Sequence, residues 1–93
     1  MPARMEWRPE HGSGPMWVDG VAVEPASLLP EELAARVIAW NDAFVDEDML
    51  PIDGPGDAVW LAEGKQLLAS VREALSESHE IVGTEPWWGE PPA

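Results

Sequence analysis

A chain of 93 residues, 45% of them hydrophobic and 25% charged, has the composition of one small globular domain and is too apolar to be disordered throughout. Its 18 acidic residues outnumber five scattered basic ones, giving a net charge of −13, so direct binding to nucleic acid or to an anionic membrane is not expected. The absence of cysteine excludes a disulfide framework and a thiolate metal site.

The N-terminal residues lack the apolar run of a signal peptide, and no stretch approaches the roughly 20 apolar residues of a membrane span, so we expect a cytoplasmic protein. Residues 5–15 predict a short extended piece followed by a flexible loop rich in Gly, Ser and Pro. Whether the extended piece is a strand is left open. We expect one domain over 1–93, with an ordered core at about 15–88 and flexible ends at 1–14 and 89–93.

Two short apolar runs flank Asp19-Gly20, the favoured pair for a two-residue type I′ turn, and predict a β-hairpin over 16–23. In this register Trp17 opposes Ala22 and lies on the face away from the core. The face expected to point toward the core carries Met16, Val18, Val21 and Val23.

The first helix is predicted over 30–46. Pro30 suits the first helical position, and Glu31 and Glu32 lie at the positive end of the helix dipole. The apolar stripe of this helix, widened by its small and branched neighbours, comprises Leu33, Ala34, Val37, Ile38, Trp40 and Phe44.

An acidic loop follows, in which Met49, Leu50 and Ile52 are expected to tuck part of the chain onto the core. The spacing of Asp46 and Asp48 matches the start of an EF-hand loop. The sixth and twelfth positions do not match, because they hold proline and aspartate in place of glycine and glutamate. A solvated loop is therefore favoured over a calcium site.

The second helix is predicted over 57–76, with Asp57 as its N-cap. Gly64 costs about 1 kcal/mol relative to Ala inside a helix, and its place on the apolar stripe predicts close packing against another backbone. A last strand near 79–84 points Ile81 inward. The stripe of the second helix comprises Trp60, Gly64, Leu67, Leu68, Val71 and Leu75.

Together these elements predict an α+β fold. It is a small single domain with an N-terminal β-hairpin, two packed α-helices and a C-terminal strand that completes a small antiparallel sheet.

No catalytic constellation can be identified. The segment "HGSGP" at 11–15 lacks the G-x-S-x-G spacing of a nucleophile elbow, so a linker is favoured. His11 and His79 are the only histidines, which disfavours a metal site. Eighteen carboxylates give no reason to prefer one pair for acid–base work. We expect no enzyme, no metal ion and no cofactor.

The tryptophans divide into two groups. Trp40 and Trp60 lie on helical stripes and are assigned to the core, whereas Trp17, Trp87 and Trp88 are candidate exposed anchors for a protein partner. In an extended "EPWWGE" the neighbouring rings point to opposite faces, so one ring is expected to pack on the domain and the other to be exposed. The alternative is a second small cluster on the back of the sheet, formed by Trp7, Trp17 and one ring of the tail pair.

The pattern "LPEELAARVIAWNDAF", an acidic loop, "AVWLAEGKQLLASVREAL" and a closing "HEIVG" resembles a group of small acidic bacterial proteins, some of them grouped with immunity proteins of toxin systems. The similarity covers residues 29–83. It offers Trp40-Asn41, Trp60 and Glu63-Gly64 as shared fold positions and transfers no catalytic residue. The resemblance implies an α+β fold, a bacterial cytoplasmic setting and a binding function.

Two functional hypotheses remain. The first is a non-enzymatic interaction protein, of the immunity, antitoxin or anti-defence type, which occupies the basic surface of a protein partner by electrostatic steering from residues 42–57. The second is a small-ligand-binding or enzyme-accessory domain with an aromatic-lined pocket, in which the charge only confers solubility. The candidate partner-binding residues are Trp17, Asp46, Glu47, Asp48, Asp53, Trp87 and Trp88.

Overall fold

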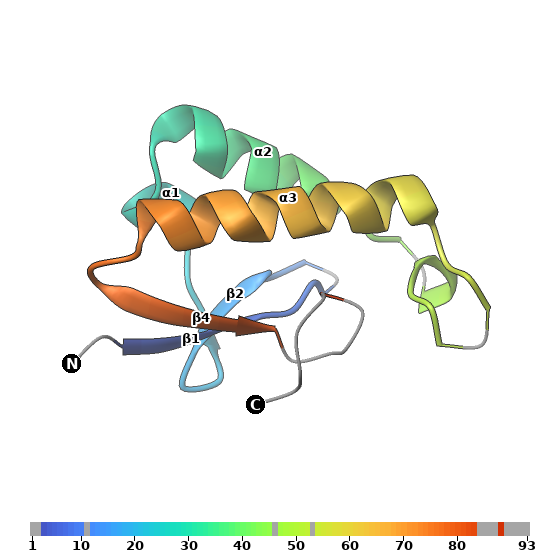
Figure 1. Ribbon diagram of the computed structural model, residues 1–93, viewed down its shortest axis with the longest axis horizontal. Helices are drawn as coiled ribbons and strands as arrows, with labels where there is room; N and C mark the ends of the chain where they lie inside the picture. Colours follow the sequence, from blue (N-terminus) through green and yellow to red (C-terminus); the bar gives the residue numbers. More distant parts are fainter. Residues whose placement is uncertain (1–2, 11, 46, 53, 84–87, 89–93) are drawn as a thin grey trace.

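The computed structural model describes residues 3–10, 12–45, 48–52, 54–83 and 88, together with the backbone alone of Glu47. These residues form the predicted α+β architecture, a four-stranded sheet in the order β3-β2-β1-β4 with helices on one face (Figure 1). The strands are β1 (Ala3–Trp7), β2 (Met16–Val18), β3 (Val21–Ala22) and β4 (His79–Gly83). The helices are α1 (Pro25–Leu28), α2 (Glu31–Asp42), the 3-10 turn η1 (Glu47–Met49) and α3 (Ala58–Ala74).

The hairpin of β2 and β3 turns at Asp19-Gly20 as predicted, with positive φ angles of 52° and 79°, the combination that a type I′ turn requires. Its register pairs Trp17 with Ala22, which confirms the predicted alignment. Val21 is 67% exposed, however, so the prediction that it faces the core is wrong. Val21 lies next to the turn on the edge strand, where the helices give it no cover.

Strand β1 is the main departure from the predicted sheet. Residues 3–7, expected to belong to a flexible end, form a strand between β2 and β4. This strand pairs with β2 in antiparallel and with β4 in parallel orientation, so the sheet is mixed and the predicted antiparallel closure is wrong. Met5 and Trp7 are fully buried, and burial of these two large side chains provides the free energy that orders the segment.

The parallel pairing follows from the path of the long helix. Helix α3 carries the chain back along the sheet to the end where β1 begins (Figure 1). There the Ala3 amide donates to the Ser78 carbonyl over 3.1 Å, immediately before β4 starts. Strands β1 and β4 therefore start at the same end and run side by side, as a helical crossover requires.

Helix α2 is shorter than predicted. It begins after Pro30, which lies at the N-cap and not at the first helical position, and it ends at Asp42. Phe44 is buried nonetheless, because the chain turns inward directly after the helix. Helix α3 begins as predicted, since the Asp57 carboxylate accepts a hydrogen bond of 3.0 Å from the Trp60 amide. Within the described ranges no helix is long and apolar enough to cross a bilayer.

The core is organised around two stacked tryptophans. The rings of Trp40 and Trp60 lie 4.4 Å apart at an interplanar angle of 8°. Trp7 stacks on the outer side of Trp40 at 5.4 Å, and Phe44 stacks on Trp60 at 5.4 Å. Trp88 meets Trp40 edge-on at 5.7 Å. Trp7 and Trp88 thus belong to the main core, and the alternative of a second tryptophan cluster behind the sheet is wrong.

Gly64 on α3 provides the room that this stack needs. A Cβ atom placed on Gly64 would lie 2.4 Å from one ring carbon of Trp40 and 2.9 Å from a ring carbon of Trp88. The predicted close packing is confirmed, but the neighbours are indole rings and not a second backbone. Both rings are buried, so neither can move aside without disturbing the rest of the core.

Replacement of Gly64 tests this packing. Gly64→Ala gains up to about 1 kcal/mol of helix propensity. Overpacking of a core costs roughly 1–3 kcal/mol, and the close contact with Trp40 places the cost at the upper end of this range. We therefore expect urea titrations to show a net loss of about 1–2 kcal/mol of unfolding free energy. The matched control is Gly54→Ala in the α2–α3 connection, where an added Cβ meets no atom within 4 Å, and it should melt like the wild type. A Gly64→Ala protein as stable as the wild type would contradict the packing.

Candidate functional site

Two of the three predicted tryptophan anchors, Trp17 and Trp88, are buried in the structure. Trp88 is only 4% exposed and lies in the core, which confirms that one ring of the tail pair packs on the domain. Trp87 lies outside the described residues, so the predicted exposure of the other ring stays a prediction. Trp17 is 9% exposed. Neither Trp17 nor Trp88 can serve as an exposed anchor, and that prediction is wrong for both.

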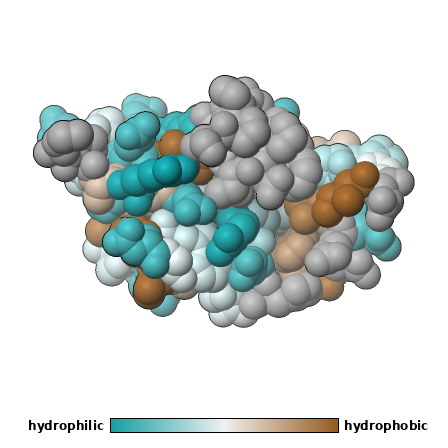
Figure 2. All heavy atoms as spheres, turned by 90° about the horizontal axis from the view of Figure 1, so that it is seen from below, coloured by the Kyte–Doolittle hydropathy of each residue, from teal (hydrophilic) through white to brown (hydrophobic). Residues whose placement is uncertain are grey.

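Trp17 lies outside the main core cluster, as predicted from the alternation of the hairpin, but other groups cover it. Its indole N–H donates to the Arg8 carbonyl over 2.8 Å, and the Arg8 guanidinium lies 4.7 Å from the ring centroid. The backbone of Gly14 packs closely against the indole nitrogen. The coloured part of this face of the sheet is mostly hydrophilic (Figure 2). Trp17 therefore holds the 8–14 segment against the sheet.

The predicted acidic residues belong to the connection between α2 and α3. Asp48 is exposed in η1, Glu47 begins η1 with only its backbone described, and Asp46 and Asp53 lie outside the described residues. In the sequence no Lys, Arg or His occurs between Arg36 and Lys65. The acidic residues within that stretch are Asp42, Asp46, Glu47, Asp48, Asp53, Asp57 and Glu63.

Three exposed apolar side chains flank or lie within the same connection. Val45 is 71%, Ile52 57% and Val59 81% exposed. The connection between α2 and α3 lies at the right-hand end of the molecule in Figure 1. Figure 2 shows hydrophobic atoms at that end. The prediction that Ile52 tucks onto the core is wrong, whereas Met49 and Leu50 do pack against it. We call Val45, Ile52 and Val59, together with the acidic residues that lie between positions 45 and 63 of the sequence, the acidic end.

Sequence reasoning missed Val45 and Val59 as surface residues. A usable signal was present for Val59. It immediately precedes Trp60 and so falls off the apolar stripe that the spacing of α3 defines. The spacing of the stripe therefore places Val59 on the solvent-facing side of α3.

Backbone contacts fold the connection onto the domain and hold the acidic end in place. The Met49 carbonyl accepts a hydrogen bond of 3.0 Å from the Asp57 amide, and the Met49 sulfur accepts one of 3.4 Å from the Val45 amide. Gly56 adopts a positive φ of 70° close to the Met49 carbonyl, where a side chain would clash. These contacts fold part of the connection back on itself, while Asp48, Ile52 and Gly54 remain exposed to solvent, as expected for a solvated loop. No group of three metal-ligating side chains occurs among the residues that the structure describes.

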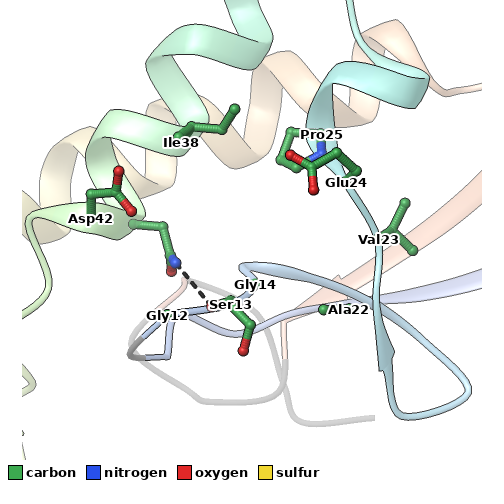
Figure 3. Close-up of a pocket in the computed structure, with 10 residues that line it drawn as sticks. Gly12, Ser13, Gly14, Ala22, Val23, Glu24, Pro25, Ile38 and Asp42 are labelled. Carbon is green, nitrogen blue, oxygen red and sulfur yellow. Dashed lines mark hydrogen bonds between the residues drawn. The ribbon is translucent and has the colours of Figure 1, made fainter.

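A pocket of about 230 Å³ lies beside the C-terminal half of α2 (Figure 3). Figure 3 shows the carboxylates of Glu24 and Asp42 on opposite sides of the pocket, both turned toward it, with Ile38 above them. Among the described residues that line it none is aromatic, contrary to what the ligand-binding hypothesis expects. The lining residues are Gly12, Ser13, Gly14, Ala22, Val23, Glu24, Pro25, Ile38, Asn41 and Asp42.

Asn41 builds the wall of this pocket. Its side chain is 4% exposed, and its amide donates to the carbonyls of Glu10 and Ser13 over 3.1 and 2.9 Å. Its oxygen accepts from the Glu10 amide over 3.3 Å. The Gly-Ser-Gly segment is thus a turn tied to α2, in which Ser13 contributes its backbone carbonyl. The resemblance implied only that Asn41 is a shared fold position, and nothing in the sequence indicated its hydrogen-bond partners.

Comparisons of the chain with protein-family models, with curated proteins and with solved structures found no match. The resemblance to immunity-like proteins therefore stays a hypothesis. Geometry, exposure and charge at the acidic end and at the pocket carry the functional proposals below.

Asn41→Ala tests whether this side chain holds the pocket wall. The change leaves two partly buried carbonyls without their donor, so we expect a loss of roughly 1–3 kcal/mol of unfolding free energy and faster amide exchange over 10–14. The neighbouring exposed Asp42→Ala is the control and should change the stability by no more than about 0.5 kcal/mol. Equal stability of the two variants would show that Asn41 does not hold the turn.

Proposed function

We propose that the protein is a non-enzymatic interaction protein that binds a basic protein partner through its acidic end. The proposal rests on the exposure of Val45, Ile52 and Val59. These residues lie in a stretch of chain that contains seven acidic residues and no basic residue. Apolar side chains surrounded by charge are the pattern of a protein-binding surface, in which a dry centre is enclosed by a polar rim.

The two kinds of side chain do different work in such an interface. The valines and the isoleucine give up water when the partner covers them, which provides affinity. The carboxylates attract a basic surface over about 10 Å at 0.1 M salt and raise the association rate. This division replaces the tryptophan anchors of the sequence-based hypothesis, because Trp17 and Trp88 are covered by other parts of the domain.

The alternative of a small-ligand domain finds less support. It requires aromatic rings along a pocket, whereas Trp7, Trp40, Trp60 and Trp88 are packed against one another in the core. Two pockets formed by described residues, one beside the C-terminal half of α2 and one beside the first turns of α3, have no aromatic side chain among their lining residues. A binding role of the immunity, antitoxin or anti-defence type in a bacterial cytoplasm accords with the resemblance over 29–83 and with the charge.

Val59→Ser tests the apolar part of the acidic end. Val59 is 81% exposed, so the change should leave the melting temperature nearly unaltered. The partner captured from the native host should bind this variant more weakly by about 1–2 kcal/mol, measured by titration calorimetry. Val21→Ser is the matched control, since it removes an exposed valine from the hairpin, and it should bind like the wild type. Equal affinities of both variants would refute the assigned surface.

Salt dependence tests the electrostatic part. Raising the salt concentration from about 50 to 500 mM screens exposed charges, so association should slow while dissociation changes little. A variant that combines D48N and E63Q, at two exposed positions, should show a shallower salt dependence than the wild type, measured by stopped flow. A partner that associates at the same rate at all salt concentrations would remove charge from the mechanism.

A further inference from the structure

We propose that the pocket between the 12–14 turn and the C-terminal end of α2 receives one cationic side chain, Arg or Lys, of the protein partner. The inference rests on the proposed function, because it specifies how a basic partner is recognised. It adds a site that the acidic end does not include, and it assigns roles to Glu24, Asp42 and Asn41.

Electrostatics favour a positive charge at this position. The carboxylates of Glu24 and Asp42 face the pocket from opposite sides (Figure 3), and within the described residues neither has an ion-pair partner. The pocket also lies at the C-terminal end of the 12-residue helix α2, where the helix dipole is negative. No basic residue occupies the last turn of α2 to neutralise that end.

The walls suit a side chain with an apolar stem and a charged tip. Val23, Pro25 and Ile38 offer apolar surface to methylene groups, while the two carboxylates lie at the rim. The volume of about 230 Å³ is below the roughly 300–1,000 Å³ of ordinary small-molecule sites, which favours a single side chain over a whole metabolite.

The pocket is preformed and adjoins the acidic end. Asn41 makes two hydrogen bonds to the backbone of Glu10 and one to the Ser13 carbonyl, which ties the 12–14 turn to α2, so little ordering is required when a side chain enters. Asp42 contributes to the pocket and lies three positions before Val45, the first residue of the acidic end. A partner that covers Val45 therefore has its own surface close enough to reach into the pocket.

The test uses the full chain, labelled with ¹⁵N, and a capped arginine, Nα-acetyl-arginine methylamide, as the probe. At constant ionic strength we expect saturable shifts of the Gly12 and Gly14 amides and of the Asn41 side-chain amide. The citrulline analogue, which has nearly the same shape but no charge, should cause none. Shifts that citrulline or sodium chloride reproduces, or shifts spread over all acidic residues, would overturn the inference.

Variants in which carboxylates are replaced by amides test which residues bind the probe. The double variant E24Q/D42N should weaken binding of capped arginine roughly tenfold, because it removes both charged acceptors. The control E31Q/E73Q removes the same charge from exposed positions of α2 and α3 and should leave that binding unchanged. Equal effects of the two variants would mean that only the net charge matters, which overturns the inference.

Binding of the partner separates this inference from the proposed function. The variant E24Q/D42N should also bind the partner more weakly than the wild type, and the loss of affinity should be larger than the loss caused by E31Q/E73Q. If Val59→Ser weakens the partner but E24Q/D42N affects it no more than the control, the pocket proposal fails and the acidic end stands. If neither variant affects the partner, both proposals fail.

Discussion

The reciprocal pairing of Trp40 and Trp60 is the interaction on which the rest of the structure depends. Each indole N–H donates to the backbone carbonyl of the other residue, over 2.8 and 3.0 Å, so neither buried donor of the pair is left without an acceptor. The stacked rings exclude water from both bonds. Because one residue lies near the end of α2 and the other near the start of α3, the pair fixes how the two helices meet.

Both candidate surfaces depend on this pair through their neighbours in the chain. Asn41, next to Trp40, ties the 12–14 turn to α2 and so shapes the pocket. Val59, next to Trp60, must point away from the core because Trp60 points into it. The connection that bears the acidic residues begins and ends beside the stacked rings, so rigidity in the core is passed directly to the surface that we assign to the partner.

Local signals predicted the local elements well. Asp19-Gly20 specified the hairpin turn, and Asp57 specified the start of α3, because each acts on its own neighbouring backbone. The parallel pairing of β1 with β4 and the cover over Trp17 could not be predicted, since both depend on segments that meet only in the folded chain. At the surface, charge predicted the acidic region, but the apolar residues within it needed the exposures that only the structure provides.

The strong imbalance of charge would give the proposed partner a physical role in stability. Eighteen acidic residues face only five basic ones, so the excess carboxylates repel one another across a small domain, and this repulsion opposes the compact state. The aromatic stack around Trp40 and Trp60 offsets the repulsion through burial. A basic surface bound at the acidic end would reduce the repulsion among carboxylates in the stretch that has no basic residue. Any partner that binds only the folded chain also stabilises the fold by mass action. The charge that makes the free domain less stable is therefore the same charge that favours association.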